Sequence, residues 1–257
     1  MSFIGCQFLG RLGNAMFSYA FARGFAERHG LELHTDRWVG QKIFEINDPP
    51  IVMHHAKCNR DENNIKDDDK DFVYRSYSQN QKCADYYTRE RVKKWFAFRP
   101  EVESLLAAVK FDMPQNHLAH LRRGDYAGYG FPVISKQSYL KSAEQIGITD
   151  LIFVEEPKNP YVFPFTGKDG VLISLKSFDG DFSMLLDFYR MMKSDILFRG
   201  NSTFSWWAAT LGNGRVFSPI VKGIGLVGGK EVDVEFVEGN HPACSDFDFV
   251  TDIHLKP

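Results

Sequence analysis

The sequence predicts an α/β protein with parallel sheets, because short apolar segments alternate with helical segments in both halves of the chain. Near the start, an apolar segment over 3–9 is followed by a glycine-rich turn, a helical pattern over 15–29 and the start of a second strand over 31–34. The same alternation returns after residue 114. A chain of 257 residues has room for two domains of ordinary size.

The helix over 15–29 is predicted from phenylalanines at four-residue spacing, which line one face of a helix: Phe17, Phe21 and Phe25. Asn14 is a suitable N-cap, and Gly30 is a suitable residue to end the helix. This strand, helix and strand open the first domain.

The middle of the chain carries the predicted domain boundary. Residues 48–71 are irregular, and we interpret their acidic triplet at 67–69 as an exposed loop rather than a metal-binding D-x-D motif. Residues 88–110 read as a helix that breaks before Pro114. We therefore expect an N-terminal α/β domain over 1–113 and a C-terminal Rossmann-like domain over 114–257.

The second half has the pattern of a further α/β domain. The expected strands cover 118–121, 151–154, 171–175, 195–198 and 216–218, and the expected helices cover 136–146, 182–193 and 203–211. Residues 232–236 alternate like a strand and are expected to form a hairpin across Gly228 and Gly229.

Composition excludes several classes of protein. With 31 basic and 33 acidic residues, the net charge of -2 argues against nucleic acid as a partner. The four cysteines form no C-x-x-C pair, and no histidine lies in an H-E-x-x-H motif, so no metal site is expected. Without a signal-peptide pattern or a long apolar stretch, we expect a cytoplasmic protein, soluble or peripherally membrane-associated.

The first candidate site is His120-Leu-Arg-Arg-Gly-Asp-Tyr126, at the carboxyl end of an expected strand, where α/β sheets bind ligands. Two adjacent arginines cannot point the same way, so one of Arg122 and Arg123 is aimed at a given ligand. Asp125 can accept hydrogen bonds from Arg122 and fix its side chain, and a fixed guanidinium suits a phosphate. The alternative is a surface ion pair of little consequence.

Two further segments are weaker signals on their own. Gly200-Asn-Ser-Thr-Phe-Ser-Trp-Trp207 follows an expected strand and opens a helix, so it can bind an anion, although an ordinary N-cap looks the same. The turn formed by Gly10, Arg11, Leu12, Gly13 and Asn14 is neither a P-loop nor a complete dinucleotide-binding fingerprint.

Together, these three segments resemble the α-1,2-fucosyltransferases, and more distantly the protein and chitooligosaccharide fucosyltransferases. The matching pieces are the turn at 10–14 with Met16-Phe17, the arginine motif at 120–126, Asp187-Phe-Tyr, and Asn201-Ser-Thr-Phe-Ser-Trp-Trp-Ala-Ala209. The resemblance covers roughly residues 3–220. It implies a GT-B-like architecture with two Rossmann-type domains facing a cleft, and inverting transfer without a metal or cofactor.

The resemblance also implies roles for individual residues. The first domain would bind a glycan acceptor, and the second would bind the donor GDP-L-fucose. Arg122 would hold the β-phosphate with support from Asp125, and Asp187 would read the guanine. The other donor-binding residues would be His120, Arg123, Asn201, Ser202, Thr203 and Phe204. Gly10, Arg11, Gly13 and Asn14 would close over the diphosphate and the acceptor.

This sequence departs from the pattern in ways that leave the general base open. Val154-Glu-Glu156 stands where many relatives have Ser-Asp-Asp, and the stretch over 127–130 lacks the carboxylate that some related fucosyltransferases carry there. Asp125, Asp36 and Glu156 remain candidates. We expect transfer of L-fucose to O2 of a galactoside; transfer from another GDP-deoxyhexose such as GDP-rhamnose, and a non-catalytic nucleotide- or glycan-binding module, are the alternatives.

Overall fold

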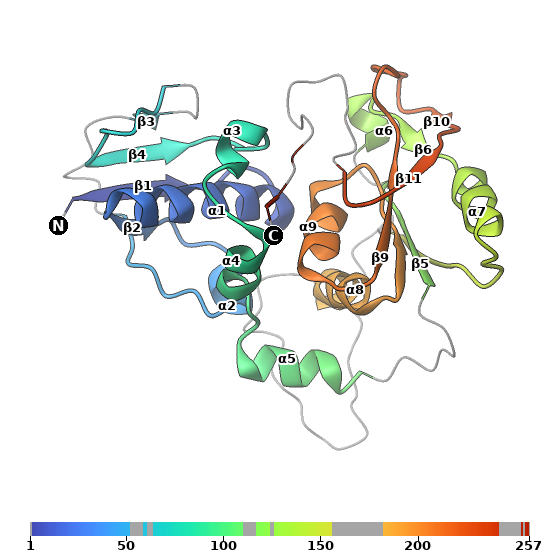
Figure 1. Cartoon of the computed structure of the whole chain (residues 1–257), viewed down its shortest axis with the longest axis horizontal. Coiled ribbons are helices and arrows are strands. Elements are labelled where there is room, and N and C mark those ends of the chain that lie inside the picture. The colour runs from blue at the N-terminus through green and yellow to red at the C-terminus, as the bar shows by residue number, and fades with distance from the viewer. Residues whose placement is uncertain are drawn as a thin grey trace. The chain divides into compact units, whose positions relative to one another are not determined.

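The computed structural model describes residues 2–51, 59–60, 64–109, 117–123, 126–155, 182–241, 253 and 255–256. The chain divides into two compact units (Figure 1). Unit 1 consists of Met1–Val102 and Cys244–Pro257, and unit 2 consists of Glu103–Ala243. The boundary expected at 113 and 114 lies outside the described residues.

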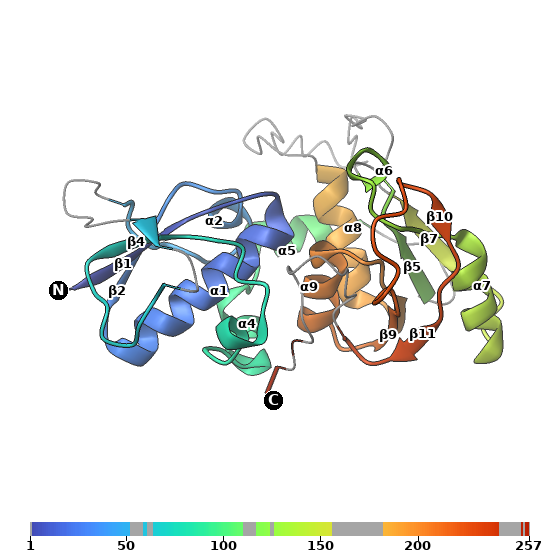
Figure 2. The ribbon, with the colours of Figure 1, turned by 90° about the horizontal axis from the view of Figure 1, so that it is seen from above.

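The described part of unit 1 contains a four-stranded parallel sheet in the order β2-β1-β4-β3. Its strands are β1 (Phe3–Gln7), β2 (Glu32–Thr35), β3 (Asn59–Arg60) and β4 (Phe72–Arg75). In register, Ile4 lies between Leu33 on β2 and Phe72 on β4. Helix α1 (Leu12–His29) connects β1 to its parallel neighbour β2 and lies along the sheet (Figure 2).

Helix α1 confirms the predicted apolar face, because Phe17, Phe21 and Phe25 are all buried. It ends where predicted, at Gly30, whose left-handed backbone (φ 65°) lets its N–H bond the carbonyl of Ala26. Its start was predicted too late: the helix begins at Leu12, and the N-cap position is Arg11 rather than Asn14.

The single helix predicted over 88–110 is wrong, because two helices lie there: α4 (Arg89–Trp95) and α5 (Pro100–Ala107). Thr88 caps α4, and Pro100 occupies the first position of α5, where its missing N–H costs nothing. The short helices α2 (Gly40–Ile43) and α3 (Gln81–Ala84) also belong to unit 1, whereas α5 spans the division between the two units. No helix in the described ranges is long and apolar enough to cross a membrane.

The described part of unit 2 contains a five-stranded sheet in the order β11-β9-β8-β5-β7. Strands β5 (His117–Leu121), β7 (Ile152–Glu155), β8 (Ile196–Phe198) and β9 (Arg215–Pro219) are parallel, and β11 (Phe236–Glu238) is antiparallel to β9. These four parallel strands were predicted; the strand expected over 171–175 lies outside the described residues.

The helices predicted in the second half are confirmed as α7 (Lys136–Gln145), α8 (Phe182–Lys193) and α9 (Thr203–Leu211). A further short helix, α6 (Tyr126–Tyr129), follows the arginine motif. One face of α8 packs into the core, since Leu185, Phe188 and Met191 are buried.

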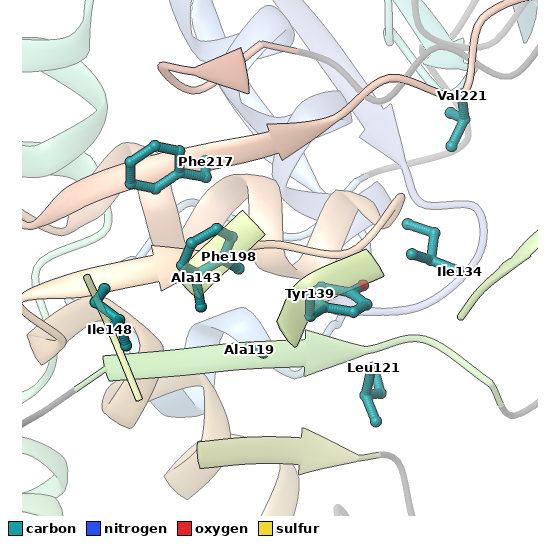
Figure 3. Packing of buried hydrophobic residues seen from close by; sticks show 9 residues of the cluster. All are labelled: Ala119, Leu121, Ile134, Tyr139, Ala143, Ile148, Phe198, Phe217 and Val221. Carbon is teal, nitrogen blue, oxygen red and sulfur yellow. The ribbon is translucent and has the colours of Figure 1, made fainter. Parts of the chain in front are cut away.

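The core of unit 2 fixes the central strands relative to one another (Figure 3). Phe198 of β8 stacks on Phe217 of β9 with ring centroids 4.7 Å apart. The buried Tyr139 of α7 donates a hydrogen bond of 2.9 Å to the carbonyl of His120 on β5. The carboxyl ends of β5 and β8 are therefore held by packed neighbours.

The predicted hairpin across Gly228 and Gly229 is wrong. Strand β10 (Glu231–Val232) pairs in parallel with β6 (Val133–Ile134), in a separate two-stranded sheet, while β11 joins the main sheet. Both glycines have positive φ, as a turn requires, but the segments after them pair with strands distant in the sequence. An alternating pattern indicates a strand without naming its partner.

Candidate active site

The carboxyl ends of β5 and β8 form the topological switch point of the sheet in unit 2. After β5 the chain adds β7 on one side, and then β8 on the other side of β5. In open α/β sheets, ligands bind at the carboxyl ends of strands at such a point. The arginine motif follows β5, and the segment from Arg199 to Ser202 follows β8.

Gly200 lets these two segments approach closely. A Cβ atom at this position would lie 2.8 Å from the carbonyl oxygen of His120, 3.1 Å from its Nδ1 and 3.5 Å from Cβ of Arg122. Only a residue without a side chain fits so close to a neighbouring backbone. The structure thus brings together two motifs that begin 80 residues apart in the sequence, at His120 and at Gly200.

Arg122 is held next to the segment that follows β8. Its guanidinium carbon lies 4.9 Å from the ring centroid of Tyr126, a distance typical of a cation–π contact. The hydroxyl of Tyr126 donates a hydrogen bond to the carbonyl of Asn201, whose amide donates to the carbonyl of Pro132 at 3.0 Å. Tyr126 therefore connects both motifs, although the sequence assigned it no role.

Arg123 faces other partners, as the geometry of adjacent side chains predicts. Its Nε lies 3.5 Å from Oε1 of Glu155, and its Nη1 lies 3.0 Å from Oε1 of Glu231. These carboxylates belong to β7 and β10. They offset the charge of Arg123.

His120 is buried and electrically neutral at physiological pH. Burial, with the nearby Arg122 and Arg199, lowers its pKa from 6.5 to about 3. Its ring lies 5.9 Å from that of Phe204, which in turn packs 5.1 Å from the ring of Phe188. Among the described residues, Nδ1 of His120 has no hydrogen-bond partner. A neutral imidazole can donate one hydrogen bond and accept another.

The N-terminus of α9 opens at the same edge of the sheet. Ser202 is its N-cap, and its hydroxyl accepts a hydrogen bond of 3.3 Å from the N–H of Phe204. Thr203 is the first helical residue, and no acidic residue lies in the first turn. The remaining N–H groups and the helix dipole favour an anion here.

The structure says less about three further predicted residues. Asp187 lies on α8, partly exposed, with Oδ1 3.6 Å from Nη1 of Arg190 one turn later. Asp125 lies outside the described residues, as does Glu156. Within the described ranges, no three His, Cys, Asp or Glu side chains gather as metal ligands would.

Unit 1 has a second switch point, because β1 lies between β2 and β4. The glycine turn follows β1, Asp36 follows β2 and Arg75 ends β4. Gly13 and Asn14 belong to the first turn of α1, and the side chain of Asn14 accepts a hydrogen bond of 2.9 Å from Gln79. Arg11 is exposed.

We expect Gly10→Ala to destabilise the protein more than Gly30→Ala. Both glycines have positive φ (72° and 65°), which costs an alanine about 1 kcal/mol. A Cβ on Gly10 would also lie 2.3 Å from Nδ2 of Asn14, whereas no described atom lies within 4 Å of one on Gly30. Thermal unfolding of the two variants measures the difference, and equal shifts in Tm would contradict it.

The comparisons with known proteins concern the fold. The sequence matches no protein-family model and no curated protein. Solved structures of NodZ α-1,6-fucosyltransferase are similar. The form soaked with GDP-fucose has a TM-score of 0.54 and 14% identity, with 84% of this chain and 94% of NodZ covered. NodZ from Bradyrhizobium has a TM-score of 0.56 and 12% identity over 92% and 98% of the two chains.

The chain has the fold of these fucosyltransferases. This similarity confirms the predicted α/β, GT-B-like fold, with a parallel sheet in each unit. NodZ has also been crystallised with GDP, and that structure has a TM-score of 0.54 to this chain. The linkage named for NodZ is α-1,6, whereas the motifs of this sequence resemble the α-1,2 enzymes.

Proposed function

We propose that this protein is a glycosyltransferase that moves L-fucose from GDP-L-fucose to a hydroxyl of a glycan acceptor, with O2 of a galactoside as the expected position. The observation that carries the proposal is the meeting of Arg122 with the N-terminus of α9, across Gly200, at the switch point of unit 2. The shared fold with a fucosyltransferase supports the same reaction class.

The chemistry needs a group that stabilises a departing diphosphate. As the bond between C1 of fucose and the β-phosphate oxygen breaks, negative charge grows on GDP while the acceptor oxygen bonds C1 from the opposite face. The guanidinium of Arg122 and the N-terminus of α9, with its helix dipole, supply fixed positive charge for that leaving group. In this proposal the transfer inverts the configuration at C1 and needs no metal, as the resemblance implies.

Guanine recognition is assigned to Asp187, with His120 beside the nucleoside. A carboxylate can accept hydrogen bonds from both N1–H and the exocyclic amine of guanine, a pair that uracil lacks. Asp187 lies on α8, whose Phe188 packs on Phe204 at the start of α9. The guanine and diphosphate subsites would thus be carried by two packed helices.

For the general base we propose Asp36, one of the three candidates that the sequence offers. It follows β2 at the carboxyl edge of the sheet in unit 1, the unit expected to bind the acceptor. Burial raises the pKa of Asp36, and the charge of Arg75 partly opposes this shift. A raised pKa makes a carboxylate a better proton acceptor near neutral pH.

Asp36→Asn is therefore expected to lower kcat by about 10²–10⁴-fold. In the wild type, kcat should fall as pH drops through the raised pKa of Asp36, because the protonated form cannot accept the acceptor's proton. The pH profile of the variant should lack this acid limb. A variant with wild-type kcat and an unchanged profile would remove Asp36 from this role.

The function is tested by incubating the protein with lactose and, in turn, GDP-fucose, GDP-rhamnose and UDP-galactose, in the presence of EDTA. We expect release of GDP and a fucosylated product of matching mass with GDP-fucose, undiminished by EDTA. Turnover with GDP-rhamnose alone would assign a different deoxyhexose. Product from UDP-galactose alone would refute the GDP assignment, and GDP binding without turnover on a broad acceptor panel would indicate a non-catalytic module.

A further inference from the structure

A buried cation, Arg199, lies directly behind the candidate active site. It is the residue after β8, and only 1% of it is exposed to solvent. Its N–H donates a hydrogen bond of 3.0 Å to the carbonyl of Phe217, so its backbone continues the pairing with β9. An arginine is seldom buried in this way unless its donors are well placed, because removing a charge from water is costly.

The side chain of Arg199 donates hydrogen bonds to two different segments at the edge of the sheet. Its Nε donates a hydrogen bond of 2.8 Å to Oγ of Ser218 on β9. Its Nη1 donates one of 3.2 Å to the carbonyl of Gly200, the residue that packs against His120. The guanidinium is therefore fixed between β9 and the segment that leads into α9.

The hydroxyl of Ser218 is itself held in place. It donates a hydrogen bond of 2.7 Å to the carbonyl of Gly239 and accepts one of 3.0 Å from the N–H of His241. These contacts orient the hydroxyl oxygen so that it can accept the hydrogen bond from Nε of Arg199. A series of hydrogen bonds therefore restricts the position of the turn before α9. It runs from Gly239 through Ser218 and Arg199 to Gly200.

We propose that Arg199 is a positioning residue for diphosphate recognition: it fixes the Gly200 carbonyl, and with it the start of α9, and its buried charge strengthens the binding of the nucleotide's phosphates. This inference rests on the proposed function and deepens it. No phosphate contact by Arg199 itself is implied. The residue acts through the turn and through the electrostatic field at the edge of the sheet.

Two further observations are consistent with that role. Gly200, the residue fixed by Arg199, is also the acceptor of a hydrogen bond of 3.2 Å from Oγ of Ser205 within α9. The positive charge of Arg199 also reaches the site, since it is one of the groups that disfavour protonation of His120 and lower its pKa. A cation in a low-dielectric interior acts over a longer range than one in water.

The test compares the affinities for GDP and guanosine in the wild type and in Arg199→Gln and Arg199→Lys. We expect Arg199→Gln, which loses the charge, to weaken GDP binding by on the order of 100-fold, and Arg199→Lys, which keeps the charge but loses the fork, by on the order of 10-fold. Guanosine binding should stay as in the wild type, because guanosine has no phosphate. Calorimetry measures GDP, and ligand-observed NMR measures guanosine.

If Arg199 had a purely structural role, its replacement would weaken the binding of both ligands or of neither. An unchanged ratio of the GDP and guanosine affinities in a folded variant would therefore overturn the proposal. Circular dichroism identifies the folded variants, and if Arg199→Gln does not fold, Arg199→Lys decides. Arg215→Gln is the matched control, because Arg215 pairs with Glu238 at the exposed start of β9. Absence of GDP binding in the wild type would instead refute the proposed function.

Discussion

Replacing Arg122 by lysine is expected to reduce kcat/KM for GDP-fucose by about 10²–10³-fold while leaving the fold intact. Lysine keeps the positive charge but is a point charge on a flexible stem, so it cannot offer two parallel hydrogen bonds to a phosphate. Its ammonium also cannot reproduce the contact that the guanidinium of Arg122 makes with the ring of Tyr126. Steady-state kinetics with GDP release as the signal measures the loss.

The matched control is Arg215→Lys, an exposed arginine at the start of β9 that pairs with Glu238. It should keep wild-type kinetics. Arg123→Lys is expected to cost less than Arg122→Lys, because the carboxylates of Glu155 and Glu231 offset the charge that Arg123 could offer a phosphate. If Arg122→Lys retained wild-type rates, Arg122 would have no place in the mechanism; if Arg123→Lys cost more, the two assignments would have to be exchanged.

Gly200→Ala should abolish most activity and lower the thermal stability. The added Cβ would lie 2.8 Å from the carbonyl oxygen of His120, which is itself held by Tyr139. Neither backbone can move without disturbing a packed strand, so the ends of β5 and β8 would separate. We expect a loss of the order of 1–3 kcal/mol in unfolding free energy, measured by chemical denaturation.

Gly128→Ala is the control for this substitution. Gly128 lies in the short helix α6, and no described atom lies within 4 Å of where its Cβ would be. Alanine also favours a helix over glycine, so stability should be unchanged or slightly raised. A Gly200→Ala protein as stable and as active as Gly128→Ala would show that the two motifs do not depend on this close approach.

Much of the fold could be predicted because its signals are local. The phenylalanines of α1 and the apolar segments of the four parallel strands of unit 2 are visible in any short window of sequence. The break at Pro100 was also visible as a helix-start signal, but the prediction ran past it. The partners of β10 and β11 could not be read, because pairing across the sequence leaves no local trace.

The residues alone predicted separate motifs, and only the resemblance placed them in one candidate site. The segment over 200–207 was expected to contain a helix cap, which is Ser202, and the divergence of Arg122 from Arg123 followed from their adjacency. Arg199 was missed, because an arginine at a strand end ordinarily faces water. Its burial depends on Ser218, which belongs to a different strand, and no pattern in the sequence connects the two.

The return of the chain to unit 1 has a consequence for how the protein responds to trimming. The N–H of Arg89 donates a hydrogen bond to the carbonyl of Lys256, and Ile253 is buried. The last residues therefore help to stabilise unit 1 (blue to teal in Figure 1), although unit 2 precedes them in the sequence. Unit 2 is thus a continuous segment inserted between the two segments of unit 1. Exopeptidase digestion from the carboxyl terminus should destabilise unit 1 first and leave the protease resistance of unit 2 unaltered.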